Sequence, residues 1–137
     1  MKIYFTFSKS YIKVLCLFLL AAFSFLSVAS GNIPKTTLEN EKQRAMFLEQ
    51  YGFCVDDPVS VKAVTVPLVF NDDYEKFYNA LKAGGYDIDS FKGRKLTEYT
   101  YYTENSNLIH LLMDDKILVG ADCVNLDNGS IHPLAGE

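Results

Sequence analysis

The sequence has no acidic residue before Glu39, and Lys2, Lys9 and Lys13 are the only charged side chains in its first stretch. An uncharged run rich in Leu and Phe follows at residues 14–28. A basic start before an apolar run is typical of a signal peptide. At about 1.5 Å per residue the run reaches roughly 22 Å, short of the ~30 Å hydrocarbon core of a membrane. We therefore predict a cleaved signal peptide at residues 1–31, with an uncleaved N-terminal membrane anchor as the alternative.

The end of this run has the small side chains that a signal peptidase requires, and they favour cleavage near Ala29 to Gly31. Lysines on the N-terminal side of an apolar segment place the rest of the chain outside the cytoplasm, whether or not cleavage occurs. We expect an extracytoplasmic protein that is secreted or tethered to the cell membrane by this segment. A short linker at residues 32–36 and a single small domain at residues 37–137 would follow it.

The exported part lacks an excess of positive charge. Without the three leading lysines, ten basic residues face seventeen acidic ones, so this part carries a net charge of about −7. Phosphate binding requires a basic surface, and this composition therefore disfavours a nucleic-acid partner.

Cysteine is scarce, and only Cys54 and Cys123 remain after the leader. Their spacing is not that of a metal site. In an oxidising compartment such a pair favours a disulfide, which would contribute roughly 4 kcal/mol by closing a loop of about seventy residues. Two buried free thiols are the alternative.

Two segments show helical periodicity. Thr36 and Glu39 have the spacing of a capping box and predict a helix over residues 37–51. A second helix is predicted from residue 71 or 72 to the glycine pair Gly84-Gly85, which would end it. The apolar face of this second helix consists of Tyr74, Phe77, Tyr78 and Leu81.

The remaining segments favour strands. β-Branched residues predict a strand over residues 61–70, in which Pro67 marks an edge or a bend. Further strands are predicted at residues 94–103, 107–113 and 116–124, with a short piece around Ile131. Asp114 and Asp115 separate the last long pair, which is the length of a tight hairpin. This order predicts an α+β fold, with both helices packed on one face of a small, mostly antiparallel sheet.

Several short motifs are shared with a known family. They are Tyr51-Gly52-Phe53 with Val55, Val66-Pro67, Tyr74, Tyr78 and Asn79, Gly85-Tyr86-Asp87, Lys92-Gly93, Tyr99-Thr100-Tyr101 and Gly120-Ala121-Asp122. Together they cover most of residues 44–134 and resemble the bacterial extracytoplasmic domain of unknown function 4830. That family has no assigned activity and typically follows a signal peptide or a single anchor in Gram-positive bacteria. The resemblance implies a localisation and a fold, and it implies no chemistry.

Tyrosines are the most suggestive candidates for ligand contact. Tyr86, Tyr99, Tyr101 and Tyr102 form an aromatic set that could stack on a sugar or a peptide from an exposed sheet face. Ordinary cross-strand packing in a half-buried sheet is the alternative interpretation.

Two further kinds of site are weaker. Cys123 and His110 could meet across a hairpin as a thiol and its base, but a strand cysteine lacks the helix N-terminus that usually lowers a thiol pKa. The acidic and amide side chains near the C-terminus do not keep the register of a calcium loop. These side chains are Asp114, Asp115, Asp122, Asn125, Asp127 and Asn128. We therefore expect no catalytic residue, metal or cofactor.

The sequence favours a non-enzymatic binding or regulatory module at the bacterial cell envelope, because it combines aromatic strands with no convergent polar triad. The expected partner is an envelope protein, a peptide or a wall polymer, and membrane contact is expected only through an uncleaved N-terminal segment. The alternatives are a small secreted hydrolase or thiol enzyme that uses Cys123 and His110, and a divalent-cation-binding domain.

Overall fold

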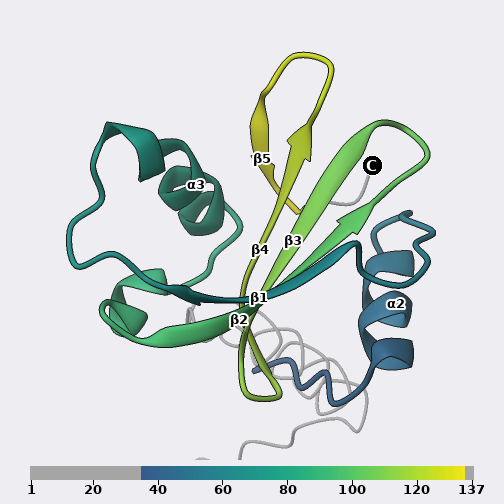
Figure 1. Cartoon of the computed structure of the whole chain (residues 1–137), viewed down its shortest axis with the longest axis horizontal. Helices are drawn as coiled ribbons and strands as arrows, with labels where there is room; N and C mark the ends of the chain where they lie inside the picture. Colours follow the sequence, from purple (N-terminus) through teal and green to yellow (C-terminus); the bar gives the residue numbers. More distant parts are fainter. Residues whose placement is uncertain (1–34, 135–137) are drawn as a thin grey trace, which may run out of the picture. The chain divides into compact units, whose positions relative to one another are not determined.

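A computed structural model of the chain describes residues 35–134 (Figure 1). The predicted leader lies outside the described residues, as does most of the predicted linker. The elements in chain order are α2 (Glu41–Glu49), β1 (Ser60–Thr65), α3 (Asp72–Ala83), the 3-10 turn η1 (Ile88–Phe91), β2 (Lys95–Tyr102), β3 (Asn107–Asp114), β4 (Ile117–Asn125) and β5 (Ile131–Pro133). The strands form one antiparallel sheet in the spatial order β1-β2-β3-β4-β5. The α+β class and the predicted order of helix, strand, helix and meander are confirmed.

The helices lie on opposite faces of the sheet, which differs from the expected placement on one face (Figure 1). The reason is the composition of β3, which carries apolar side chains on both of its faces. Ile109 and Leu111 belong to the core under α2, whereas Leu112 packs with the core under α3. Because successive strand residues point to opposite faces, each apolar face needs its own cover.

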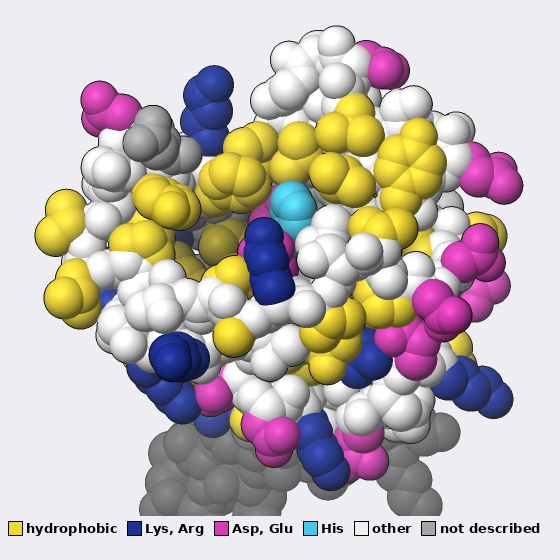
Figure 2. Space-filling view, in the orientation of Figure 1, with side chains coloured by type: hydrophobic (Ala, Val, Ile, Leu, Met, Phe, Trp, Pro, Cys, Tyr) yellow, Lys and Arg dark blue, Asp and Glu magenta, His cyan; other side chains and the backbone are white. Residues whose placement is uncertain are grey.

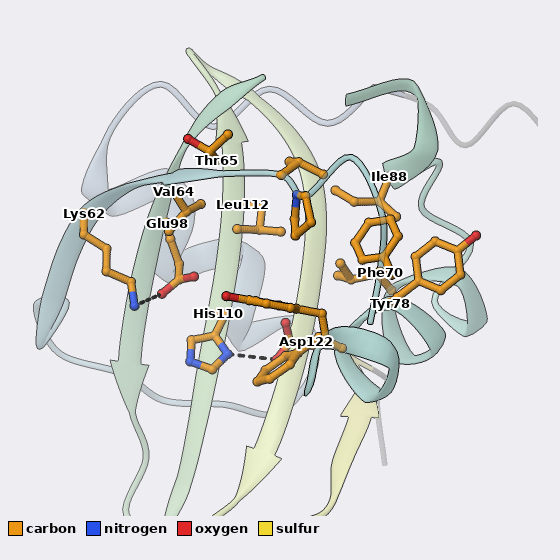
Figure 3. Close-up of a pocket in the computed structure, with 15 residues that line it drawn as sticks. Lys62, Val64, Thr65, Phe70, Tyr78, Ile88, Glu98, His110, Leu112 and Asp122 are labelled. Atoms are coloured by element: carbon orange, nitrogen blue, oxygen red, sulfur yellow. Dashed lines mark hydrogen bonds and ion pairs between the residues drawn. The ribbon is translucent and has the colours of Figure 1, made fainter. Parts of the chain in front are cut away.

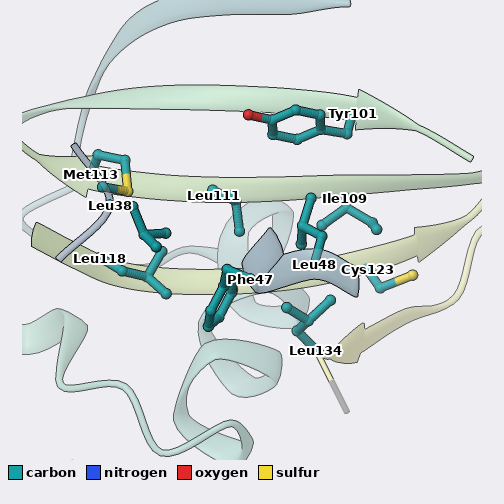
Figure 4. Close-up of a cluster of buried hydrophobic side chains, with 11 residues drawn as sticks. Leu38, Phe47, Leu48, Tyr101, Ile109, Leu111, Met113, Leu118, Cys123 and Leu134 are labelled. Atoms are coloured by element: carbon teal, nitrogen blue, oxygen red, sulfur yellow. The ribbon is translucent and has the colours of Figure 1, made fainter. Parts of the chain in front are cut away.

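The larger core lies between α2 and the sheet (Figure 4). Its residues are Leu38, Phe47, Leu48, Tyr101, Ile109, Leu111, Met113, Leu118, Ala121, Cys123 and Leu134. The smaller core, under α3, consists of Val66, Leu81, Ile88, Leu96 and Val119. This second core is the one that positions the candidate site.

α2 begins later than the capping-box pattern predicts. Its N-cap is Asn40, whose side-chain oxygen accepts a hydrogen bond of 3.0 Å from the backbone N–H of Gln43. The preceding segment is extended instead, because Thr37 forms a bridge with Ile117 and Leu38 N donates to Lys116 O at 2.8 Å. Pairing with β4 therefore prevails over the local helix signal at these positions.

α3 begins and ends close to where the sequence predicts. Its N-cap is Asn71, and Gly84 follows the last helical residue. Gly85 adopts a left-handed conformation with φ of 84°, which glycine accommodates without strain.

The strand before α3 is shorter than predicted, since β1 ends at Thr65, two residues ahead of Pro67. The β3–β4 turn also shifts by one residue, because Asp114 pairs with Ile117 and Asp115 takes the left-handed conformation (φ 54°).

Candidate ligand-binding site

A hollow lies on the face of the sheet that carries α3. α3 packs against β4 and β5. The hollow lies between this helix, β1 and the part of the sheet formed by β2, β3 and β4 (Figure 2). Its volume is about 460 Å³, in the range of small-molecule sites. β1 and the loop after it contribute Lys62, Val64, Thr65, Val66, Pro67 and Phe70. The other lining residues are Tyr74, Phe77, Tyr78 and Leu81 of α3, Ile88 of η1, and Glu98, His110, Leu112 and Asp122 of β2–β4. We call this site the α3 hollow.

The deep part of the α3 hollow is apolar. Val66, Leu81 and Ile88 line it and belong to the core under α3, with exposures of 5%, 4% and 1%. Two aromatic rings stiffen its wall, since Phe70 and Tyr78 stack with ring centroids 4.3 Å apart. Buried apolar side chains exclude water and would accept the apolar body of a ligand.

One wall of the α3 hollow carries a histidine–aspartate pair (Figure 3). His110 and Asp122 face each other across β3 and β4, and His110 Nδ1 lies 2.8 Å from Asp122 Oδ1. A carboxylate only accepts hydrogen bonds, so Nδ1–H of the imidazole is the donor. The Asp122 side chain is 3% exposed and that of His110 is 16% exposed. Asp122 therefore fixes the orientation of the imidazole ring. The second ring nitrogen of His110, Nε2, is left for a ligand.

Burial and the Asp122 carboxylate shift the pKa of the His110 imidazole in opposite directions. Burial by itself lowers the pKa of His110, but the hydrogen bond and charge of Asp122, with a contribution from Glu98, outweigh it and raise the pKa above its usual value of 6.5. Burial also raises the pKa of Asp122, and the hydrogen bond from His110 opposes that rise. The pair consequently retains a proton at higher pH than a free histidine would.

A second charged pair lies beside the first. Lys62 Nζ is 2.9 Å from Glu98 Oε1, and the two residues stand opposite each other on β1 and β2. The Lys62 side chain is 59% exposed and that of Glu98 is 16% exposed. Thr100 Oγ1 also donates to Glu98 Oε1 at 3.4 Å. The ammonium group is thus the accessible member of this pair.

Strand register explains how the two pairs come together. Glu98 pairs with Leu112, and Thr100 pairs with His110, so these side chains share the face of the sheet that carries α3. The sequence patterns predict His110 only as a partner for Cys123, and they place Asp122 only among acidic residues that do not keep the register of a calcium loop. The available signal was a polar residue interrupting the apolar segment around His110, but only the register identifies its partners.

The predicted aromatic set does not form a common ligand-facing surface. Tyr101 is fully buried in the core under α2, which corrects its interpretation as a ligand contact. Its hydroxyl donates to Glu41 Oε1 at 2.8 Å and accepts from Arg44 Nε at 3.1 Å. Burial, followed by the hydrogen bond to Glu41, raises the pKa of this hydroxyl. An apolar ring with a polar end therefore joins β2 to α2.

The other three tyrosines differ from one another in exposure. Tyr99 is half-buried, and the guanidinium carbon of Arg44 lies 4.0 Å from its ring centroid. Tyr86 is half-buried against both cores, and burial raises its pKa to about 12. Tyr102 is 49% exposed and is the one member of the predicted set that is open to solvent. Cross-strand and core packing, the alternative interpretation, describes most of the set.

Cys54 and Cys123 are free thiols, so the disulfide that the sequence favours is not formed. Cys54 is exposed and Cys123 is buried in the core under α2. Cys123 also faces away from His110, because Cys123 pairs with Ile109 whereas His110 pairs with Asp122 on the opposite face. Burial, with the charge of Asp122, raises the pKa of the Cys123 thiol. The structure therefore does not bring together the thiol and base of the predicted enzyme site.

Several of the acidic and amide residues near the C-terminus have structural partners. Asp114 forms an ion pair of 2.9 Å with Arg94. Asn125 Oδ1 accepts hydrogen bonds from the backbone N–H groups of Asp127 and Asn128, at 3.0 and 3.2 Å. Across residues 35–134, no group of three or more His, Cys, Asp or Glu side chains has the geometry to hold a metal ion.

No family model, curated protein or solved structure matches this chain. The resemblance to domain of unknown function 4830 therefore stays a prediction. Within the described part of the chain, no helix is long and apolar enough to cross a membrane.

Proposed function

We propose that this chain is a non-enzymatic binding module of the bacterial cell envelope and that the α3 hollow is its ligand-binding site. One observation carries the proposal: a largely apolar cavity of about 460 Å³ has on its wall a half-buried histidine bonded to a buried aspartate. Clefts of this size with few polar groups and a residue of perturbed pKa are the usual form of a ligand site.

The proposed envelope location rests on the N-terminal sequence. Three lysines precede an uncharged apolar run, which supports export, and the resemblance to an extracytoplasmic family agrees with it. N-terminal sequencing of the protein recovered from the cells that make it tests this part. A start near residue 30 supports a cleaved leader, whereas a start at Met1 in the membrane fraction supports an anchor.

The binding site is tested by amide NMR with a panel of small amphiphilic compounds. Binding in the α3 hollow predicts chemical-shift changes at His110, Leu112 and Phe77. A variant that fills the hollow, Val64→Trp, should remove these changes, while Val61→Trp on the same strand serves as a control, because Val61 lies outside the lining. Changes confined to other regions, or unaffected by Val64→Trp, would reject the α3 hollow as the site.

Hydrolysis is a second candidate function, and the His110–Asp122 pair favours it, since an aspartate-oriented imidazole can act as a general base. The lining contains no Ser or Cys, and in this candidate function His110 would activate a water molecule as the nucleophile. Para-nitrophenyl acyl esters provide a direct assay. Turnover by the wild type that His110→Gln abolishes would establish this activity, and equal background rates in both proteins would eliminate it for these esters.

A further inference from the structure

The α3 hollow has a distinct polar side and a distinct apolar interior. His110 and the exposed Lys62 lie along one wall, whereas the deepest lining residues are apolar, with Ile88 1% exposed. Figure 3 shows the two charged pairs on one side and Phe70, Tyr78 and Ile88 on the other. A ligand that satisfies both regions carries a polar group at one end and an apolar body at the other.

The hydrogen-bonding capacity that remains on the polar side belongs mainly to donors. The Asp122 carboxylate is 3% exposed and is held by His110, and Glu98 Oε1 already accepts from Lys62 and Thr100. The ammonium group of Lys62 has three N–H donors. Within residues 35–134 it forms one ion pair, with Glu98, so donors remain for a ligand. His110 adds Nε2–H when its ring is protonated. The polar end of the ligand should therefore be an acceptor.

The cations on this side are also the more accessible charges. Lys62 is 59% exposed against 16% for Glu98, and His110 is 16% exposed against 3% for Asp122. Lys62 is therefore the most exposed of the four charged groups, and His110 is more exposed than the aspartate that it bonds. Hydrogen bonds from cationic donors to a carboxylate are shorter and stronger than neutral ones.

The loop between β1 and α3 extends the apolar region to the surface. Leu68 and Val69 are 72% and 78% exposed, and they lie between the lining residues Pro67 and Phe70. Tyr74, also in the lining, is 50% exposed. Large apolar side chains that stay in water beside a cavity indicate a surface that an apolar ligand covers.

We propose that the ligand of the α3 hollow is an amphiphilic monocarboxylate, whose carboxylate accepts hydrogen bonds from His110 Nε2 and Lys62 Nζ and whose apolar chain lies among Val66, Leu81 and Ile88. This inference rests on the proposed binding function and specifies the ligand class. It also implies that binding is coupled to protonation of His110, because the protonated ring supplies both a donor and a positive charge. The charged groups that act on His110 are Lys62 of β1, Glu98 of β2 and Asp122 of β4, and the titratable Tyr74 and Tyr78 of α3 line the same hollow.

Three probes of one chain length separate the polar end from the apolar body: decanoate, decanol and decylamine, each below its micelle concentration. The chain has no tryptophan, so Phe77→Trp provides a single fluorescent reporter in the wall of the hollow. Amide NMR of the wild type checks that the reporter does not alter binding. Decanoate should bind about tenfold or more tightly than decanol, with decylamine weakest. Butyrate, which has the carboxylate but little apolar chain, should not bind measurably.

Two variants test the assigned contacts. Lys62→Gln and His110→Gln should each reduce the preference for decanoate over decanol about tenfold, and Lys95→Gln, an exposed lysine outside the lining, should leave it unchanged. Wild-type affinity for decanoate should fall as the pH rises through the pKa of His110. His110→Gln should lack this pH dependence, which distinguishes a direct contact from a structural role.

The outcomes separate this inference from the proposed function. Equal affinities for the three probes, or tighter binding of decylamine, would overturn the carboxylate assignment and leave the α3 hollow as a binding site. Decanoate binding that is the same at all pH values and in Lys62→Gln would overturn the assigned contacts. No binding of any amphiphile would overturn the inference together with the proposed function.

Discussion

His110 Nδ1 lies 2.8 Å from Asp122 Oδ1, and the two residues face each other across β3 and β4 in the wall of the α3 hollow. Burial of the carboxylate is compensated by this one contact with an imidazole. A buried charge that keeps a hydrogen-bonded partner is much less costly than an unpaired one. The properties of the site therefore depend on both members of the pair.

Asp122→Asn should lower the pKa of His110. Asparagine retains a hydrogen-bond acceptor but has no charge, so the lowering effect of burial on the imidazole is no longer outweighed. The chain contains two histidines, and an NMR pH titration of their ring protons measures both. His132→Gln assigns the signals. A pKa of His110 that is the same in wild type and Asp122→Asn would contradict the assigned role of the carboxylate.

The pair should also make stability depend on pH. The folded-state pKa of His110 is raised above the unfolded value of 6.5, so its contribution is fully present below about pH 6.5 and is lost as the pH rises through the folded-state pKa. The raised pKa of Asp122 also makes stability fall with rising pH, but this loss begins at about pH 3.8, the unfolded value of the carboxyl group. Urea unfolding measured from pH 6.5 upward should show that the free energy of unfolding decreases for the wild type and decreases less for His110→Gln. Stability that increases equally in both proteins would refute the prediction.

Tyr101→Phe should destabilise the fold by about 1–2 kcal/mol, because it removes a buried hydroxyl that bonds both Glu41 and Arg44. Tyr102→Phe is the matched control, since it removes the hydroxyl of the neighbouring residue, which is 49% exposed, and should change the free energy of unfolding by less than about 0.5 kcal/mol. Urea denaturation of the three proteins provides the comparison. Equal effects of the two substitutions would show that the link between α2 and β2 contributes nothing.

Gly120→Ala should cost about 1–3 kcal/mol through overpacking. A Cβ atom at this position would lie 3.0 Å from Leu81 Cδ2 and 3.1 Å from Leu112 Cδ1, which is too close for unstrained packing. Leu112→Ala removes one of these atoms, so the double variant should lose less stability than the two single variants predict together. A double-mutant cycle from urea denaturation measures this coupling. Additive effects would mean that the close approach of the Leu112 side chain to Gly120 is not limiting.

Cys54 should react quickly with iodoacetamide in the native protein without reductant, because it is exposed. Cys123 should react only on unfolding, since it is buried and its thiol has a raised pKa. Mass spectrometry of proteolytic peptides distinguishes the two sites. If neither cysteine is labelled until a reductant is added, the pair forms a disulfide after all. Rapid native labelling of Cys123 would revive the thiol-enzyme hypothesis.

Local patterns in the sequence identify the secondary structure well where no distant partner competes. The second helix is predicted to begin at residue 71 or 72 and to end at Gly84-Gly85, and α3 is observed at Asp72–Ala83. The first helix is predicted too early because Thr36 and Glu39 resemble a cap, whereas Leu38 pairs with Lys116. A local cap signal contains no information about a hydrogen bond to a residue almost eighty positions away.

The candidate site was much less accessible from the sequence. Tyr101 and Tyr102 are neighbours of the same type, yet one is fully buried and the other is half exposed, because adjacent strand residues face opposite sides. Which side is covered depends on where the helices pack. The same alternation separates Cys123 from His110, which the hairpin predicted from the sequence could have brought together.

Hydrophobic periodicity and glycine stops act over a few residues, and for that reason local patterns were enough to predict the α+β class, the order of the elements and the span of α3. The packing of the two helices on opposite faces became visible only in the folded chain, as did the meeting of four polar side chains in one hollow: Lys62, Glu98, His110 and Asp122. Those four residues lie on four strands. Strand register and sheet order bring them together, and these depend on long-range packing that no local pattern encodes.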